Sequence, residues 1–133
     1  MRTIIAGSRD GVVYQDIIEA VMSAGWIPSV VVCGMCRGAD LLGKRWADER
    51  NIPVEKFPAE WRVDGVYDNA AGHKRNAVMA KNAEALIAIW DGESSGTQGM
   101  IKLAEKAGLA VHIWKLTKET SPKVVEYING CNG

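Results

Sequence analysis

The chain has 133 residues, which suits one domain with a buried core. Its 16 lysines and arginines balance 16 aspartates and glutamates, so no overall charge favours nucleic acid or an anionic membrane, and we expect no direct nucleic-acid binding. The sequence shows no signal peptide and no apolar run of membrane-spanning length, so we expect a cytoplasmic protein without a membrane partner.

Short apolar runs alternate with amphipathic, helix-like patterns along the chain. In chain order we predict strand 3–5, helix 13–24 ending at Gly25, strand 30–32, helix 41–51, strand 54–57, an irregular stretch 58–72, helix 73–82, strand 85–90, helix 97–107, strand 110–114 and a short helix 122–128. The continuously aliphatic runs 30–32 and 86–89 are typical of strands buried on both faces. The pattern predicts the α/β class, a doubly wound parallel sheet of about five strands with helices on both faces.

Three glycine-bearing loops follow predicted strands, namely AGSR at 6–9, GMCRGAD at 34–40 and DGESSGT at 91–97. Such a loop leaves backbone N–H groups free at the start of the next helix, where they bind anions and phosphate above all. In an open parallel sheet these loops meet at the carboxyl edge. If the first strand lies between the second and fourth, Ser8, Arg37 and Thr97 converge on one crevice. The sequence therefore predicts a phosphate-bearing ligand.

Several of these residues also have a purely structural interpretation. Gly34 and Gly38 are suited to a tight turn, and Asp40 is suited to be the N-cap of the next helix. Ser95 and Thr97 are also typical cap residues, a role compatible with a phosphate site. Other residues leave two interpretations open: Asp91 and Glu93 as ribose ligands or exposed loop carboxylates, and Trp61 as a base-stacking ring or an ordinary core or rim residue.

Cys33 and Cys36 form a C-x-x-C pattern, which is found in metal sites and in thiol redox sites. A zinc site needs further ligands, and the candidates Cys131, His73 and His112 are scattered along the chain. We therefore expect no metal and interpret the cysteines as buried or loop thiols. No nucleophile or acid pattern accompanies either histidine, so no catalytic residue is assigned.

The segments AGSR, GMCRGAD, WADERNIPVEKFPAEW and AAGHKRNAVMAKNAEALIAIWDGESSGT together resemble the SLOG superfamily, above all its short stand-alone YspA-like members. The resemblance runs from about residue 2 to about residue 116. It implies a Rossmann-like nucleotide-binding domain over residues 1–116, with 117–133 as a C-terminal helix and tail packed on it. Members of the superfamily include LOG-type phosphoribohydrolases, DprA-like DNA-processing proteins and sensors of NAD-derived signals.

Two positions depart from the patterns of the superfamily. Met35 replaces the second glycine of G-G-x-R-G-A-D, and Met100 stands where the LOG enzymes carry the catalytic glutamate of P-G-G-x-G-T-x-x-E. The second departure argues against LOG-type hydrolysis. Asp40, Asp91 and Glu93 remain as possible general bases for another hydrolysis.

We therefore expect a sensor or sequestering protein that binds a nucleotide or an ADP-ribose-like derivative, with no other cofactor. The alternative is a nucleotide-processing hydrolase acting on an N-glycosidic or phosphate-ester bond, and a homo-oligomer stays open. The resemblance adds Arg75 and Asn76 to the site, which otherwise suit an exposed helix face. The expected ligand-binding residues are Gly7, Ser8, Arg9, Gly34, Arg37, Gly38, Asp40, Arg75, Asn76, Ser95, Gly96 and Thr97.

Overall fold

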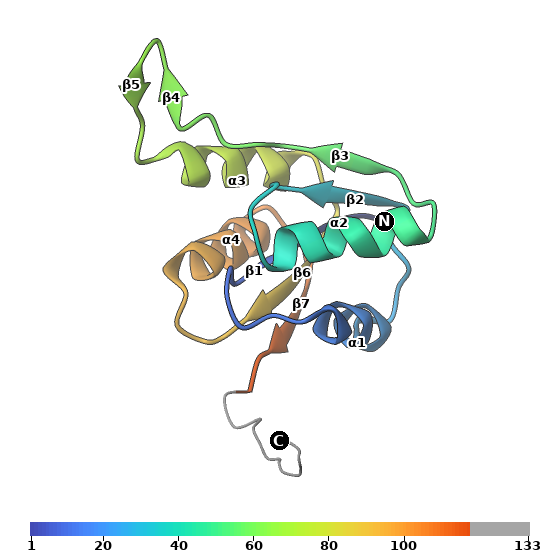
Figure 1. Ribbon diagram of the computed structural model, residues 1–133. Coiled ribbons are helices and arrows are strands. Elements are labelled where there is room, and N and C mark those ends of the chain that lie inside the picture. The colour runs from blue at the N-terminus through green and yellow to red at the C-terminus, as the bar shows by residue number, and fades with distance from the viewer. Residues whose placement is uncertain (118–133) are drawn as a thin grey trace.

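The computed structural model describes residues 1–117, so the helix expected at 122–128 lies outside the described residues. The central sheet has five parallel strands in the order β3-β2-β1-β6-β7 (Figure 1). These strands are β1 (Arg2–Gly7), β2 (Val30–Cys33), β3 (Val54–Lys56), β6 (Ala85–Trp90) and β7 (Ala110–Lys115). The predicted Rossmann-like α/β fold is confirmed, and β1 lies between β2 and β6, as convergence of the three loops requires.

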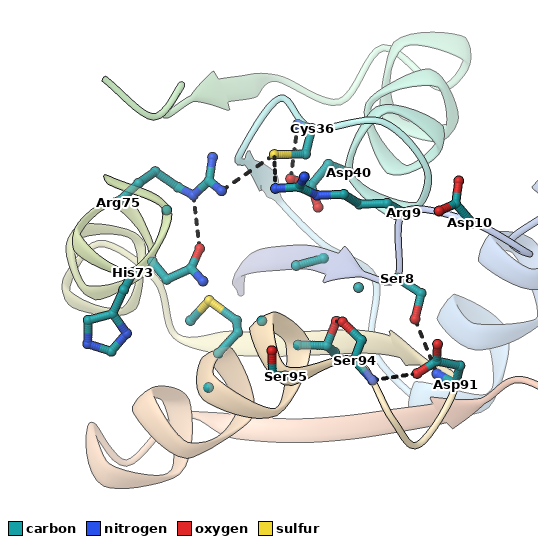
Figure 2. A pocket seen from close by; sticks show the side chains of 18 of the residues that line it. Ser8, Arg9, Asp10, Cys36, Asp40, His73, Arg75, Asp91, Ser94 and Ser95 are labelled. Carbon is teal, nitrogen blue, oxygen red and sulfur yellow. Dashed lines mark hydrogen bonds between the residues drawn. The ribbon is translucent and has the colours of Figure 1, made fainter. Parts of the chain in front are cut away.

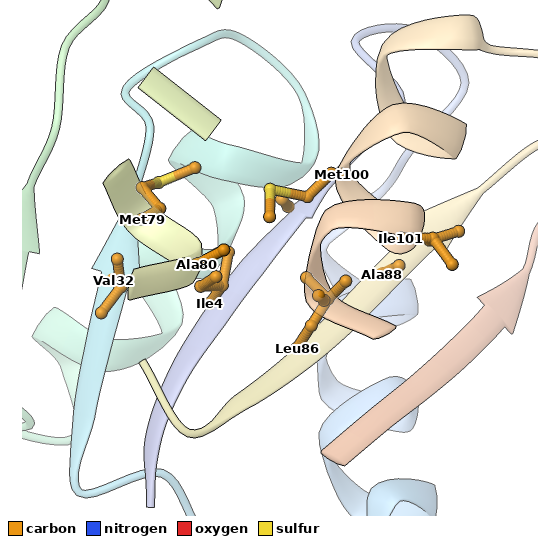
Figure 3. Packing of buried hydrophobic residues seen from close by; sticks show 10 residues of the cluster. Ile4, Val32, Met79, Ala80, Leu86, Ala88, Met100 and Ile101 are labelled. Atoms are coloured by element: carbon orange, nitrogen blue, oxygen red, sulfur yellow. The ribbon is translucent and has the colours of Figure 1, made fainter. Parts of the chain in front are cut away.

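Within residues 1–117, four helices cover the sheet, two on each face. They are α1 (Tyr14–Ala24), α2 (Ala39–Glu49), α3 (Ala71–Lys81) and α4 (Ser95–Lys106). Neighbouring residues of β1 point to opposite faces, so Ile5 packs with α1 and α2, whereas Ile4 packs with Met79 of α3 and Met100 of α4 (Figure 3). Both isoleucines are completely buried, and each contributes roughly 1.5–3 kcal/mol to stability.

Two of the structural expectations are wrong. Asp40 is not the N-cap of α2, because the helix begins at Ala39 and Gly38 takes the cap position with a φ of 82°. The stretch 58–72 is not irregular, because it contains a small antiparallel hairpin of β4 (Arg62–Val63) and β5 (Val66–Tyr67). Figure 1 shows this hairpin projecting beyond α3.

The hairpin has a sequence signal that we missed. Asp64 and Gly65 both have positive φ, 52° and 77°, as a two-residue type I′ turn requires. An Asp-Gly pair between two valines is a strong hairpin pattern, but the strands are only two residues long and their side chains are exposed. Strands this short cannot show the alternation of apolar and polar residues that predicts a β-strand from sequence.

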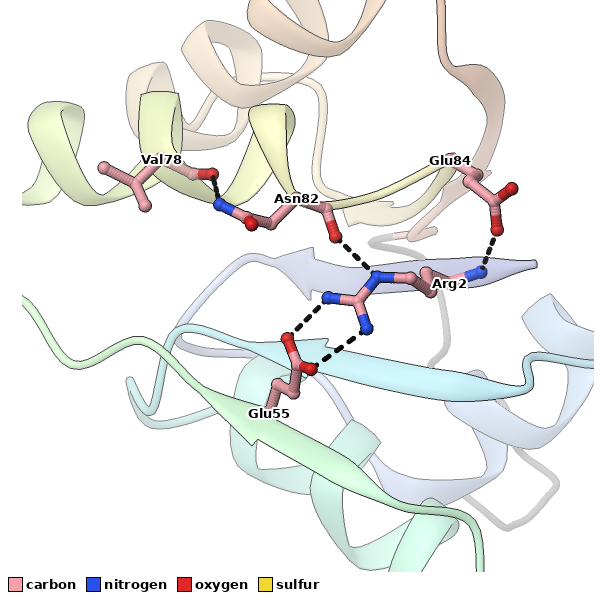
Figure 4. Close-up of polar contacts among 5 residues, drawn as sticks. All are labelled: Arg2, Glu55, Val78, Asn82 and Glu84. Carbon is pink, nitrogen blue, oxygen red and sulfur yellow. Dashed lines mark hydrogen bonds and ion pairs between the residues drawn. The ribbon is translucent and has the colours of Figure 1, made fainter.

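The amino edge of the sheet is held by Arg2 (Figure 4). Its guanidinium donates two hydrogen bonds to the carboxylate of Glu55, at 3.0 and 2.5 Å, and one to the backbone oxygen of Asn82 at 2.8 Å. The bond with Arg2 lowers the pKa of Glu55 below its usual range. This cluster joins β1 to β3 and to the end of α3, and it lies at the edge opposite the three loops. Within residues 1–117 no helix has the length and apolar content to cross a membrane.

Candidate functional site

A cavity of about 630 Å³ opens at the carboxyl edge of the sheet, a volume typical of small-molecule sites (Figure 2). It lies where the loops after β1, β2 and β6 meet the hairpin segment and the starts of α3 and α4. Its lining residues are Ala6, Gly7, Ser8, Arg9, Asp10, Cys36, Asp40, Trp61, Asn69, Gly72, His73, Arg75, Asn76, Asp91, Ser94, Ser95, Gly96, Thr97, Gly99 and Met100.

Most of the residues expected to bind ligand lie together in this cavity. They are Gly7, Ser8, Arg9, Asp40, Arg75, Asn76, Ser95, Gly96 and Thr97. Gly34, Arg37 and Gly38 are not among the lining residues. The structure therefore brings together the loops after β1 and β6, whereas the loop after β2 contributes mainly Cys36 and Asp40.

The structure places Arg37 at the surface, where its guanidinium donates to the carboxylate of Asp10 at 3.2 and 3.3 Å. Both side chains are well exposed. The two glycines beside it have packing roles. A Cβ on Gly38 would lie 2.5 Å from the backbone oxygens of Ser8 and Arg9, and one on Gly34 would lie 2.7 Å from the carboxylate of Asp40. A ligand contact by Arg37 stays a prediction.

The start of α4 forms one wall of the cavity. The first N–H groups of any α-helix have no acceptor within the helix, so those of Ser95, Gly96 and Thr97 are suited to an anion. The loop before them is ordered by Asp91, whose Oδ1 accepts from the N–H groups of Glu93 and Ser94, both at 2.8 Å. Hydrogen bonds within the loop thus fix its shape, and the start of α4 that follows it lies at the cavity.

Ser8 joins this wall to the other loops from a buried position. Its N–H donates to the backbone oxygen of Ile89 at 2.8 Å, and its hydroxyl accepts from the N–H of Asp91 at 3.2 Å. Its carbonyl accepts from the N–H of Ala39 at 3.1 Å, at the start of α2. A hydroxyl that accepts one bond still has its own proton to donate. Ser8 therefore adds a fixed donor to the cavity.

The start of α2 differs from that of α4, because the protein's own groups occupy it. The N–H of Ala39 bonds to Ser8 and that of Leu41 to the carbonyl of Cys36. The carboxylate of Asp40 accepts the N–H of Cys36 at 3.2 Å. Asp40 is only 6% exposed, and this burial raises its pKa to about 6 even though the hydrogen bond and the nearby guanidinium of Arg75 lower it. An anion at this helix end would meet a carboxyl group.

Arg75 links α3 to the loop after β2. One of its nitrogens donates to the backbone oxygens of Gly34 and, at 3.3 Å, of Phe57. Another lies 3.5 Å from the Sγ of Cys36, and the Nε donates to Asn76 at 2.9 Å (Figure 2). Arg9 approaches the same sulfur at 3.8 Å from the opposite side. Arg75 therefore holds α3 against the loop after β2 and also places its charge at the cavity. Arg9 is the more exposed of the two cations.

The two cysteines of the C-x-x-C pattern have different environments. Cys33 is completely buried, and this burial raises its pKa to about 11. Cys36 is partly exposed, and both are free thiols. Among residues 1–117, no three His, Cys, Asp or Glu side chains are grouped so that they could hold a metal ion.

Several lining residues were not predicted as site residues. Asn69, Gly72 and His73 come from the hairpin segment and the start of α3, where the sequence carries no glycine-rich motif. Trp61, for which the sequence left a base-stacking or a core or rim role open, lines the cavity with them. Met100, which stands at the catalytic glutamate position of the resembled LOG pattern, lines the cavity and is 2% exposed. The cavity therefore has an apolar thioether where that pattern has a carboxylate.

Comparisons with known proteins agree with this picture. The family model described as "YspA, cpYpsA-related SLOG family" matches residues 1–63. The uncharacterized SPbeta prophage-derived protein YoqJ of Bacillus subtilis (strain 168) is 32% identical over 63 residues, 47% of this chain and 37% of YoqJ, so the match spans little more than a third of that relative. The Gene 61 protein of Mycobacterium phage D29 is 33% identical over 119 residues, 83% of this chain and 93% of the phage protein. No solved structure matches the chain significantly.

Proposed function

The chain belongs to the YspA, cpYpsA-related SLOG family, and we propose from this that it binds a nucleotide or a nucleotide derivative in the cavity at the carboxyl edge of its sheet. The phosphate of the ligand lies at the start of α4. The protein holds the ligand as a sensor or sequestering protein and does not turn it over.

One observation carries the proposal: the start of α4 opens on a cavity that also contains two guanidinium groups. A helix N-terminus contributes roughly 0.3–1 kcal/mol to the binding of an anion at an exposed site. A hydrogen bond to a charged group contributes about 1.5–3 kcal/mol, which Arg9 is placed to supply. Because the N–H groups of Ala39 and Leu41 at the start of α2 already bond to the protein's own carbonyls, the anion site is at α4 alone.

Binding without turnover follows from Met100, whose thioether cannot act as the acid or base of a LOG-type reaction. A second candidate function, hydrolysis, is favoured by Asp40, a buried carboxyl on the cavity wall with a pKa of about 6. Turnover of a nucleoside monophosphate at about one per second or faster would favour this second candidate. We expect none.

The test places a negative charge where the phosphate is proposed to lie. Ser95 is exposed at the first position of α4, and a glutamate there suits the helix end while repelling an anionic ligand. Gln98→Glu is the matched control, because it adds the same charge on the same helix outside the lining residues. Calorimetric titration of the wild type and both variants should use AMP, ADP, NAD⁺, ADP-ribose, ribose 5-phosphate and inorganic phosphate.

We expect at least one phosphate compound to bind the wild type and the Gln98→Glu variant with similar affinity. Ser95→Glu should weaken that binding by about tenfold or more, which corresponds to about 1.4 kcal/mol. Arg9→Ala should have a similar effect, with Arg45→Ala as its control, because Arg45 is an exposed arginine outside the lining residues that pairs with Glu49. Equal binding by the wild type and Ser95→Glu would place the phosphate elsewhere.

A further inference from the structure

Trp61 places an indole ring on the wall of the cavity on the side of α3. The ring centroid lies 6.1 Å from that of Tyr67, and the two planes are within 12° of parallel. On the α3 side, a Cβ on Gly72 would come within 3.2 Å of the ring, so the absence of a side chain at Gly72 leaves room for the indole. Tyr67 therefore stacks on the ring, and the start of α3 meets the ring at its edge atoms Cη2 and Cζ2.

The hairpin that carries these aromatic residues contributes nothing to either core cluster of the described residues. Its valines Val63 and Val66 are 52% and 69% exposed, and Tyr67 is 56% exposed. The backbone oxygen of Trp61 accepts from the N–H of Asp68 at 2.7 Å, which closes the base of the hairpin. Core packing therefore does not account for the presence of the hairpin, whereas a role in positioning Trp61 at the cavity does.

The aromatic side of the cavity is separate from the proposed phosphate site. Figure 2 shows His73 and Arg75 of α3 on one side and Ser8 and Asp91 on the other. Trp61 packs against Gly72, which precedes His73 in α3. Trp61 and the start of α4 line the same cavity, so a ligand with its phosphate at α4 that extends toward the start of α3 would meet the indole with a planar group at its far end.

We propose that Trp61 stacks on the base of the bound nucleotide. The site therefore binds a nucleotide more tightly than the corresponding sugar phosphate that has no base. This rests on the proposed function, because it assumes that the phosphate lies at α4. Every nucleobase has a π face, so stacking selects for a base without choosing which one. The hairpin is then the element that recognises the base.

The test compares AMP with ribose 5-phosphate, which has the same phosphate and ribose but no base. Both are titrated into the wild type, Trp61→Ala, Trp61→Phe and Val66→Ala, the last being a control on the same hairpin away from the indole. Trp61→Ala should weaken AMP binding by about 5- to 150-fold and leave ribose 5-phosphate unchanged. Trp61→Phe should keep most of the AMP affinity, and Val66→Ala all of it. AMP should also quench tryptophan emission in the wild type and less in Trp61→Phe.

The outcomes separate the two proposals. If both compounds bind the wild type equally, or if Trp61→Ala changes their affinities alike or not at all, the stacking proposal is wrong and the phosphate site stands. If neither of these compounds nor any other phosphate compound binds the wild type, the proposed function fails and the stacking role fails with it. Only a loss confined to AMP supports Trp61 as the group that recognises the base.

Discussion

Asp40 shows how one residue changes what a motif can do. In the sequence it ends a glycine loop of the kind that binds phosphate at a helix start. In the structure the first N–H groups of α2 bond to backbone carbonyls, and the carboxyl group of Asp40 accepts the N–H of Cys36 in the loop, beside the guanidinium of Arg75. Because the carboxyl is buried, its charged form is disfavoured, and its pKa rises from 3.8 to about 6.

This residue should make the folded state less stable as the pH rises. The folded protein holds the Asp40 proton up to about pH 6, whereas the unfolded chain releases it near pH 3.8, so the folded state binds more protons between these values. The stability contribution is therefore complete below pH 3.8 and is lost as the pH passes through 6. The shift corresponds to at most about 3 kcal/mol.

Asp40→Asn should consequently be more stable than the wild type at pH 7, by up to about 3 kcal/mol, with the difference vanishing near pH 4. Urea unfolding of both proteins at several pH values between 4 and 7 measures this. Asp10, Glu49, Glu55 and Asp68, whose pKa values are lowered by their partners, contribute with the opposite sign. They are present in both proteins and cancel in the difference. A constant difference across the range would mean that Asp40 titrates normally.

At the scale of elements, the beginnings of α2 and α4 show why similar glycine-rich loops differ in what they can bind. The loop before α2 is packed against the backbone of the loop after β1, and Gly38 makes this approach possible with a φ of 82°. The start of α4 is open, since a Cβ on Gly96 would meet no atom within 4 Å. The first loop is therefore held by its packing, whereas the second leaves the start of its helix open.

A glycine at the start of α2 and one inside α4 should respond in opposite ways to replacement by alanine. Gly38→Ala should destabilise the protein by more than about 1–2 kcal/mol, the cost of a left-handed residue, because its Cβ also overlaps two carbonyl oxygens. Gly99→Ala should stabilise it by about 0.5–1 kcal/mol, because Gly99 lies inside α4 with open space around it. Denaturant unfolding of both variants gives the comparison, and a stable Gly38→Ala variant would show that the loop can move away from Ser8.

At the scale of the whole molecule, the sequence predicts the sheet better than the site. The strands are apolar runs that any parallel sheet must bury, so β6 was predicted at its exact bounds, 85–90. The positions of Ser8 and Thr97 at one edge followed from strand order, and the structure has them in one cavity. The pairing of Arg37 with Asp10 was not predictable, because the two residues are 27 positions apart and meet only through folding.

The side of the cavity that Trp61 lines was harder to predict for a related reason. Trp61 lines the cavity because a short hairpin and Gly72 hold it there, and neither leaves a periodic pattern in the sequence. Likewise, the bonds that the start of α2 makes to backbone carbonyls and the burial of Asp40 arise from folding, and a loop motif does not reveal them. Local patterns thus predict where a site forms, and tertiary contacts decide which of its groups are available.

Because the cavity draws its wall from both helical layers, a ligand in it should stabilise the whole domain. At a free concentration of about 100 times the dissociation constant, AMP should add about 2.7 kcal/mol to the free energy of unfolding. For a domain of this size that corresponds to a rise in Tm of roughly 5–15 °C, measurable by calorimetry. Gln98→Glu should keep this rise, whereas Ser95→Glu, with binding weakened about tenfold, should keep only about 1.4 kcal/mol of the stabilisation at the same AMP concentration, roughly half of it. Adenosine, which lacks the phosphate, should raise the Tm less than AMP; an equal rise with adenosine would mean that the start of α4 contributes nothing to binding.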